Sequence, residues 1–368
     1  MSFASSFTFY QQGKKPVLTG VFACLSFTYR FHQKMCKIMF VLGMDIGYSN
    51  MKLVYGDSES PKTCTQCVLP AGAAPLDRVH KTVMGEIPPD VMQVLVDDEL
   101  WASGVSQKRL SHTVRQLHKD YTCSKPYRAL FHAALNHVGK PEIDCLVTGL
   151  PVSQYFDGEK REELRTQLMG SHEVAPGVTV DVGQVVIMPQ PVGGYFHYLD
   201  NLKDPSVVTD GVVAIVDSGF FSFDWAVFEN GDLLEEHSGT TLSAVSSVIE
   251  QMQKAITREH KLSRKVSMEL LEQNIREGKD KLYLGKKRAS IDVAIKEAST
   301  TVASEAFSAL MLSIREQADE FNELHIVGGG ASMYLDSAKS LFPNVNISIT
   351  NEPVLANALG FWSYGAEQ

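Results

Sequence analysis

The chain has 368 residues, of which 44% are hydrophobic and 21% are charged, and its formal net charge is −9. The length suffices for two domains, and the composition is that of a soluble globular protein. The acidic balance provides no broad basic surface, so we expect no direct binding to nucleic acid and no membrane association.

Residues 1–37 precede the regular pattern of the chain and form a leader. Lys14 and Lys15 stand before an apolar run at residues 17–27, which is too short to span a bilayer and has no convincing cleavage site after it. We expect the leader to be disordered, or to be an upstream reading of a start at Met35 or Met39. The six scattered cysteines suit a reducing cytoplasm better than a disulfide framework.

The first strong pattern is a strand, an Asp-x-Gly turn and a second strand over residues 40–54. Asp45 and Gly47 form the turn signature, and Lys52 stands seven positions after the aspartate. The elements expected next are a loop or irregular strand at 57–75, two strands around Asp97-Asp98 at 91–101, and a helix at 127–138. They are followed by a buried strand at 143–150, a charged helix at 157–169, further strands at 178–188 and a helix at 192–199.

The same device returns at residues 213–227, where Asp217, Gly219 and Asp224 occupy the matching positions. We then expect two strands joined by an Asn-Gly turn at 227–236 and a helix at 238–252 that opens at residues 238–241. Two further helices are expected at 267–277 and 292–317. A short strand, a helix, a strand and a closing helix are expected at 324–327, 333–340, 345–349 and 352–364. The basic cluster at 281–288 is interpreted as a solvated loop, with a filament or adaptor contact as the alternative.

Two such hairpins can clamp a metal-bound polyphosphate between two domains. Glycine lets backbone N–H groups come close to phosphate oxygens, and Mg²⁺ prefers oxygen ligands and keeps several waters. We therefore expect Asp45 and Asp217 to hold Mg²⁺ through water, and Lys52 to neutralise phosphate charge. A single Asp-x-Gly is most often an ordinary hairpin turn, but two copies in the same strand context favour the clamp.

In the order of its motifs, the chain resembles the actin-like ATPase superfamily, and within it the bacterial plasmid-segregation actins of the ParM/StbA type. The resemblance is carried by two phosphate motifs at residues 45–52 and 217–224, two connecting helices at 188–195 and 351–360, and an adenosine motif at 326–331. The resemblance implies an α/β actin-like ATPase fold, with two ribonuclease H-like domains around a nucleotide cleft. It places domain I at 38–190 with a smaller subdomain at about 57–140, domain II at 191–350, and a closing helix at 351–368 that returns to domain I.

The resemblance also implies roles for individual residues. Gln190 stands where the family positions the attacking water, and a polar helix cap is the alternative interpretation. With Asp45 and Asp217 it completes the catalytic set, and the two aspartates are the metal site. The residues expected to bind the nucleotide are Gly47, Tyr48, Ser49, Asn50, Lys52, Ser218, Gly219, Phe220, Asp224, Arg276, Glu277, Gly328, Gly329 and Gly330.

The second phosphate turn departs from the family, because bulky Phe220, Phe221 and Phe223 stand where many relatives have small residues. Tyr48 is a similar departure in the first turn. We expect the pocket to be reshaped there, with backbone donors in place of hydroxyl contacts to phosphate.

The implied function is an ATP hydrolase that forms cytoplasmic filaments with ATP and Mg²⁺. By resemblance alone, the filament segregates plasmid DNA through an adaptor protein at a centromere-like site. A small-molecule kinase of the same superfamily and a non-hydrolysing scaffold or cell-shape protein are the alternatives. The choice between ATP and GTP, the filament architecture and the adaptor stay open in the sequence.

Overall fold

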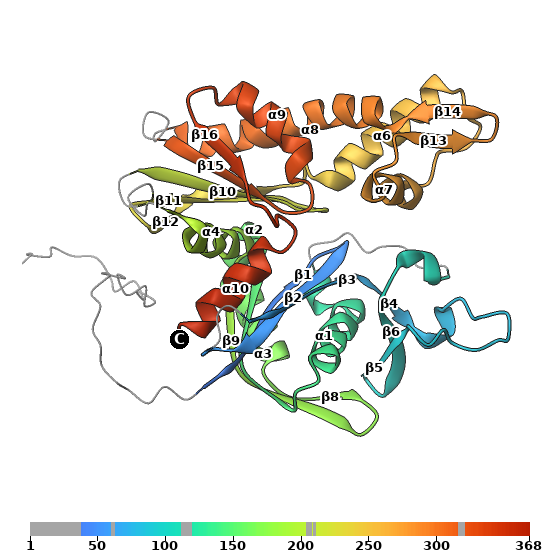
Figure 1. Cartoon of the computed structure of the whole chain (residues 1–368), viewed down its shortest axis with the longest axis vertical. Coiled ribbons are helices and arrows are strands. Elements are labelled where there is room, and N and C mark those ends of the chain that lie inside the picture. Colours follow the sequence, from blue (N-terminus) through green and yellow to red (C-terminus); the bar gives the residue numbers. More distant parts are fainter. Residues whose placement is uncertain (1–37, 60–62, 112–119, 204–207, 209–210, 316–320) are drawn as a thin grey trace, which may run out of the picture. The chain divides into compact units, whose positions relative to one another are not determined.

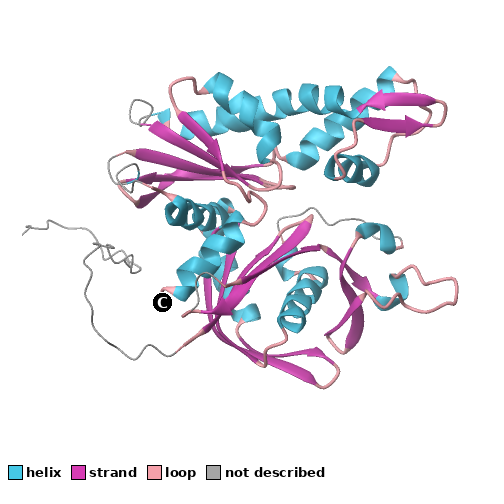
Figure 2. Ribbon diagram, viewed as in Figure 1, coloured by secondary structure: helices cyan, strands magenta, loops and turns pink. Residues whose placement is uncertain are grey.

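The computed structural model describes residues 38–59, 63–111, 120–203, 208, 211–315 and 321–368. The predicted leader, residues 1–37, lies outside the described residues. Two β-sheets with helices packed on them form two lobes (Figures 1 and 2). We call the part built on the six-stranded sheet the first lobe, and the part built on the five-stranded sheet the second lobe.

The sheet of the first lobe has the strand order β3-β2-β1-β7-β9-β8. Strands β1, β7 and β9 run parallel, and the other neighbours pair antiparallel. The central strand β1 is buried along almost its whole length, as expected for a strand with cover on both faces. The strands are β1 (Phe40–Ile46), β2 (Asn50–Asp57), β3 (Thr65–Pro70), β7 (Glu142–Leu150), β8 (Gly170–Ala175) and β9 (Val178–Pro189).

Helix α1 (Lys125–Val138) provides much of the core on one face of this sheet. Its first turn is capped by the Ser124 hydroxyl, which accepts from the Tyr127 N–H, and it ends at Gly139 in the left-handed conformation. A small sheet of order β4-β6-β5 lies beside it. The other elements of this lobe are β4 (Gly72–Pro75), β5 (Met92–Val96), β6 (Glu99–Val105), α2 (Val152–Tyr155), α3 (Gly158–Leu168) and the short 3₁₀ helices at 76–78, 107–109 and 121–123.

The sheet of the second lobe has the strand order β12-β11-β10-β15-β16, with β10, β15 and β16 parallel. Its core is rich in aromatic rings, since Phe223, Phe307 and Tyr334 are fully buried and in contact. The strands are β10 (Val212–Ser218), β11 (Phe223–Glu229), β12 (Asp232–Thr241), β15 (Phe321–Val327) and β16 (Asn346–Ile349). The helices and the outlying hairpin are α6 (Val245–Glu259), α7 (Met268–Arg276), α8 (Ile291–Ser313), α9 (Ala331–Leu341), β13 (Lys281–Leu284) and β14 (Lys287–Ser290).

Two helices, α4 (Gln190–Asn201) and α10 (Ala356–Ala366), cross between the two large sheets. Their backbones touch at glycines: a Cβ on Gly360 would clash with the carbonyl oxygen of Gly193, and a Cβ on Gly193 would lie 2.6 Å from the Asn357 carbonyl oxygen. Helix α10 also packs against β1 of the first lobe, where a Cβ on Gly43 would lie 2.6 Å from the Trp362 nitrogen. Only glycine permits such approaches, so the crossing has one close-packed arrangement.

Several sequence-based expectations need correction. Residues 238–241 were expected to open a helix, but they belong to strand β12, where the Ser238 hydroxyl accepts from the Val227 N–H. Helix α6 begins only at Val245. The expected loop at 281–288 is the hairpin β13–β14, which turns at Gly285 with a φ of 65°. Strand β8 was not expected, because its exposed polar residues carry little apolar alternation.

Other expectations are confirmed. The Asp97-Asp98 turn joins β5 to β6 with both residues at positive φ, and the Asn230-Gly231 turn joins β11 to β12 in the same way. The exact bounds predicted for the two domains, for the smaller subdomain and for the closing segment stay a prediction. Among the described residues, no helix is both long enough and apolar enough to cross a membrane.

The glycine crossing generates the first prediction. Replacing Gly360 by alanine should lower the free energy of unfolding by at least about 2 kcal/mol, because the new methyl group forces α4 and α10 apart. Urea denaturation measures this loss. The matched control is Gly158→Ala at the exposed start of α3, where a Cβ meets nothing within 4 Å and the change should be neutral or stabilising by about 0.5 kcal/mol. Equal stability of both variants would contradict a close-packed crossing.

Candidate nucleotide site

The two predicted hairpins have the same local structure. In the turn between β1 and β2, the Gly47 N–H donates to the Asn50 carbonyl at 3.0 Å, and in the turn between β10 and β11 the Gly219 N–H donates to the Ser222 carbonyl at 3.0 Å. In each copy, the second-last residue of the first strand is an aspartate: Asp45 in β1 and Asp217 in β10. The opposite residue in each pair of strands is Lys52 in the first hairpin and Asp224 in the second.

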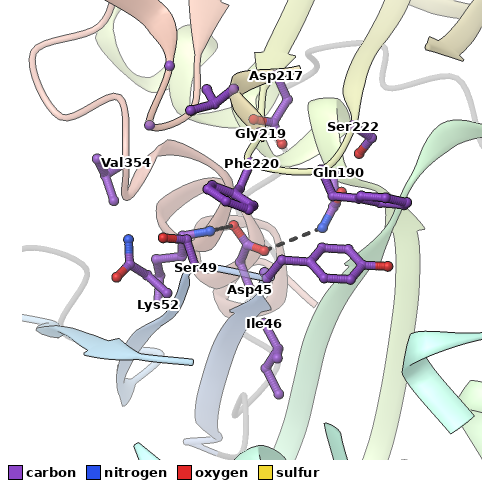
Figure 3. Close-up of a pocket in the computed structure, with 18 of the residues that line it drawn as sticks. Asp45, Ile46, Ser49, Lys52, Gln190, Asp217, Gly219, Phe220, Ser222 and Val354 are labelled. Carbon is purple, nitrogen blue, oxygen red and sulfur yellow. Dashed lines mark hydrogen bonds and ion pairs between the residues drawn. The ribbon is translucent and has the colours of Figure 1, made fainter. Parts of the chain in front are cut away.

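Both hairpin turns face one cavity of about 490 Å³ (Figure 3). This volume lies in the range of small-molecule sites, roughly 300–1,000 Å³. Asp45 and Asp217 line the cavity although their residues are only 4% and 7% exposed. The cavity is therefore walled by both lobes, with a buried carboxylate from each.

Asp45 contacts two side chains, Lys52 of the first hairpin and Gln190 of α4. The Lys52 ammonium lies 2.9 Å from Oδ2 of Asp45, and the Gln190 amide nitrogen donates to Oδ1 at 3.4 Å. The ion pair is largely screened from solvent, because Lys52 is 16% exposed. Gln190 is thus oriented toward the cavity from the first turn of α4, and Lys52 places a cation beside the first carboxylate.

Among the described residues, no cation forms an ion pair with Asp217 as Lys52 does with Asp45. The Oδ2 atom of Asp217 accepts from the Asn357 amide at 2.7 Å, at the start of α10. Burial, and after it the charge of Asp45, raise the pKa of Asp217 to about 7, although Lys52 opposes the shift. The second carboxylate therefore holds its proton more readily than an exposed aspartate.

The glycine run after β15 touches the second hairpin. Gly328 has a φ of 90°, and a Cβ there would lie against Oδ1 of Asp217 and 2.8 Å from the Ser218 carbonyl oxygen. The Gly330 N–H donates to that same carbonyl at 3.0 Å. By contrast, a Cβ on Gly329 would meet nothing within 4 Å. The outer two glycines are thus required by the close approach, and Gly329 leaves backbone exposed to the cavity.

Three of the predicted binding residues do not line this cavity. The Ser218 hydroxyl is buried and donates to the Val327 carbonyl at 2.8 Å. Glu277 is exposed and pairs with Lys279. Asp224 is buried and bonded to other groups, as described below. The predicted residues that do line it are Asp45, Gly47, Tyr48, Ser49, Asn50, Lys52, Gln190, Asp217, Gly219, Phe220, Arg276, Gly328, Gly329 and Gly330.

Asp224 instead joins the second hairpin to the first lobe. Its Oδ1 accepts from the Val152 N–H at 2.9 Å, at the start of α2, and from the Thr240 hydroxyl at 2.6 Å. Its Oδ2 accepts from the Ser222 hydroxyl. Burial raises the pKa of Asp224, while these three donors stabilise its charged form. The residue that matches Lys52 in sequence therefore serves as a contact between the lobes.

Two groups of cavity residues were missed in the sequence. At one end lie the apolar side chains of Val245, Ile249, Ile275 and Met333, from α6, α7 and α9. Single apolar residues on three amphipathic helices give no local signal that they share a wall. Asn357 was part of a quoted motif, but its contact with Asp217 depends on the helix crossing and is invisible in the chain order.

The first hairpin turn contacts the second lobe at the cavity wall. The Tyr48 ring stacks on Tyr121 with centroids 4.5 Å apart, and its centroid lies 4.6 Å from that of Phe221 in the second turn. The Ser49 hydroxyl donates to Glu272 of α7 at 2.6 Å, and Arg276 donates to Ser49 at 2.7 Å. Two adjacent residues of the first lobe thus each contact the second lobe.

Comparisons with known proteins agree with this architecture. The family model for the N-terminal domain of actin-like proteins matches residues 43–193, and the model for the C-terminal part of archaeal MreB-like actin homologues matches residues 215–338. Together these matches include both hairpins. The chain is thus built from actin-like domains. No curated protein matches it by sequence.

Solved structures give the fold of this actin-like protein independently. An archaeal actin homologue in its native form is 18% identical, with a TM-score of 0.71 over 90% of this chain and 100% of the other. A non-polymerisable quadruple mutant of pCBH ParM is 18% identical, with a TM-score of 0.69 over 89% and 99%. A 15-stranded ParM filament from Clostridium botulinum is 16% identical, with a TM-score of 0.69 over 90% and 100%. The predicted actin-like fold is confirmed.

The cavity of this actin-like protein suits a cation that keeps most of its water. Among the described residues, no group of three or more His, Cys, Asp or Glu side chains converges as a ligand set. Asp45 and Asp217 lie beside the Lys52 ammonium, while the other charged pair of the lining, Glu272 and Arg276, is joined in its own ion pair. This donor set fits Mg²⁺ held through water better than a directly ligated metal.

The raised pKa of Asp217 generates a prediction on stability. Because the folded-state pKa of about 7 exceeds the usual 3.8, stability should fall as pH rises from about 4 to 7 and level off above. Asp217→Asn keeps an acceptor for Asn357 and removes this loss. It should raise the free energy of unfolding of the ligand-free protein at pH 8, by on the order of 2 kcal/mol, with a smaller gain at pH 5.

Urea denaturation of both proteins at the two pH values measures the effect, and Asp336→Asn, at an exposed position of α9, is the control. If the difference in free energy of unfolding between the wild-type protein and Asp217→Asn were independent of pH, ionisation of Asp217 would not be the cause of the loss of stability.

Proposed function

We propose that this actin-like protein binds ATP with Mg²⁺ in the cavity between its lobes, hydrolyses it, and assembles into filaments. The observation that carries the proposal is the pair of buried carboxylates, Asp45 and Asp217, that reach one cavity from equivalent hairpins of two lobes. Lys52 and Gln190 beside Asp45 complete the set that phosphoryl transfer to water requires.

Nucleotide binding would use both ends of the cavity. The phosphates would lie against the two hairpin turns and the Gly328–Gly330 run, where Lys52 neutralises charge and Gly329 leaves the backbone open. The base would lie against the apolar wall of Ile249, Ile275 and Met333. Bound Mg²⁺ would offset phosphate charge, held through water by Asp45 and Asp217.

Hydrolysis would depend on Gln190. Its amide nitrogen is within reach of Asp45 and its side chain lines the cavity, so the amide can hold a water without any shift of pKa. Its backbone begins α4, which the glycine crossing fixes relative to α10. The amide therefore has a defined position, which water activation needs more than basicity.

Filament formation would be coupled to the nucleotide because the cavity is lined from both lobes. A bound nucleotide adds contacts to the closed arrangement, and loss of the terminal phosphate removes some of them. The coupling is then a difference in filament affinity between two nucleotide states. The likeness to a ParM filament and to an ADP complex of the archaeal homologue, both under 20% identical, supports this at the level of fold. Segregation of plasmid DNA in the cytoplasm, through an adaptor protein bound to a centromere-like site, is the biological setting that we propose.

Replacing Gln190 by alanine tests the hydrolytic role. We expect ATP turnover to fall about 100-fold while affinity for nucleotide changes little, since the positioned water is lost but the phosphate contacts remain. Phosphate release without any added acceptor, measured alongside equilibrium binding of a fluorescent ATP analogue, gives both quantities. Gln154→Ala is the matched control, because Gln154 also lines the cavity, whereas the amide that donates to Asp45 is that of Gln190.

Three results would count against the proposal. Full turnover in Gln190→Ala would remove the glutamine from the mechanism. Phosphate transfer only to an added small molecule would favour a kinase. Tight binding without turnover in the wild-type protein would favour a non-hydrolysing scaffold.

Replacing Phe221 by alanine tests the aromatic contact between the two hairpin turns. The contact between Tyr48 and Phe221 joins the two lobes, and an aromatic pair contributes about 0.5–1.5 kcal/mol. We expect bound nucleotide to dissociate about 3- to 10-fold faster, measured by stopped-flow chase of a fluorescent analogue. Phe221→Tyr keeps the ring and should dissociate at the wild-type rate. Unchanged release from Phe221→Ala would mean that the ring does not restrain opening.

A further inference from the structure

Charge is unevenly distributed along the chain. Residues 254–288 contain eleven lysines and arginines and five acidic residues, a net charge of +6. The remaining residues contain 23 basic and 38 acidic residues, a net charge of −15. The overall charge of −9 therefore conceals a strongly basic segment, which we call the basic end.

The basic end is one place in the fold as well as in the sequence. It comprises the last turns of α6, α7 and the hairpin β13–β14, which lie together at one end of the second lobe (Figure 1). All eleven of its lysines and arginines are exposed. Those with no ion pair within the described residues are Arg258, Lys261, Arg264, Lys265, Lys286, Lys287 and Arg288, of which Lys287 donates to the His260 carbonyl. Arg288 lies over the ring of Tyr283, which is itself 67% exposed.

The same lobe has an acidic opposite end. The turn between β11 and β12 and its flanks carry Glu229, Asp232, Glu235 and Glu236, and no lysine or arginine occurs between Lys203 and Lys254. We call this segment the acidic turn. In the part of the chain that the structure describes, none of its four carboxylates takes part in an ion pair.

Topology keeps these two charged regions apart within one molecule. The acidic turn lies where β10 begins, since the Asn230 N–H donates to the Gly211 carbonyl, whereas β10 ends at the cavity. Figure 1 shows β13–β14 at the other end of the lobe. The two charges therefore cannot neutralise each other inside one copy, and a second copy offers the complementary surface.

We propose that the basic end of one copy binds the acidic turn of the next. The two surfaces differ, so the contact is heterologous, and a heterologous contact that does not close generates an open polymer. This inference rests on the proposed filament function and names the surfaces that would carry it. Exposed ion pairs are individually weak, but several at one interface set orientation and give a strong dependence on salt.

The experiment uses paired charge reversals in the full chain. The basic-end variant is Lys265→Glu with Lys286→Glu, and the acidic-turn variant is Glu235→Lys with Glu236→Lys. Within the described part of the chain, none of the four side chains forms a hydrogen bond or an ion pair, so folding should persist, and nucleotide binding checks this. The control is Lys296→Glu with Lys339→Glu, two exposed lysines of α8 and α9 with the same total charge change as the basic-end variant.

We expect each paired reversal alone to raise the critical concentration for ATP-dependent pelleting about tenfold or more, and the control to pellet as wild type. An equimolar mixture of the two reversed variants should polymerise again, because each then presents the charge that the other lacks. Wild-type pelleting should decline steadily as KCl rises from about 50 to 300 mM.

The outcomes separate this inference from the function on which it rests. If the wild-type protein pellets and both reversed variants do too, the contact is overturned and the filament stands. If the reversed variants fail and their mixture also fails, the charge pairing is overturned. If the wild-type protein stays monomeric with ATP at low salt, both proposals fall. Loss of binding to a 30-base-pair DNA duplex by the basic-end variant, with normal pelleting, would assign this surface to nucleic acid and overturn the contact.

Discussion

The structure depends on how closely two helices approach each other. Helices α4 and α10 touch backbone to backbone at Gly193 and Gly360, and each helix also packs on one of the two large sheets. Each of them carries a side chain of the cavity in its first turn, Gln190 in α4 and Asn357 in α10. A looser crossing would move both amides relative to the carboxylates that they contact. The geometry of the cavity therefore depends on a contact between helix backbones that only glycine permits.

The duplicated hairpins have diverged in what they do. In the first, the residue opposite the aspartate is a lysine that faces the cavity, so the carboxylate has its own counter-charge. In the second, the corresponding residue is Asp224, whose oxygens are taken up by donors that include the N–H of Val152 in the first lobe. One hairpin thus supplies the positive charge of the site, and the other supplies a buried connection between lobes.

The sequence was most informative about features that a short, contiguous segment of the chain defines. Strand, Asp-x-Gly and strand is a local pattern, and its two copies led to both carboxylates. Gln190, the glycine run at 328–330 and the actin-like fold came from the resemblance that the ordered set of motifs carries. The sequence was least informative about groups that meet only across the fold, such as the apolar wall around Ile249.

Two expectations concern side-chain oxygens whose partners only the tertiary structure defines. Residues 238–241 were expected to open a helix, but the Ser238 hydroxyl accepts from a neighbouring strand, and a helix cap and a strand contact use the same side-chain oxygen. Asp224 was expected to bind the nucleotide, which stays a prediction, and its oxygens accept from backbone and hydroxyl donors. Local propensity cannot choose between partners that tertiary structure provides.

The bond from Asn357 to Asp217 has a mechanical meaning. Asp217 belongs to the second lobe, while the helix that carries Asn357 lies on β1 of the first lobe through Trp362. A proton or cation that changes the charge on this carboxylate also changes the strength of a hydrogen bond that joins the two lobes. The occupancy of the cavity is thereby linked to the attachment of α10 to the second lobe.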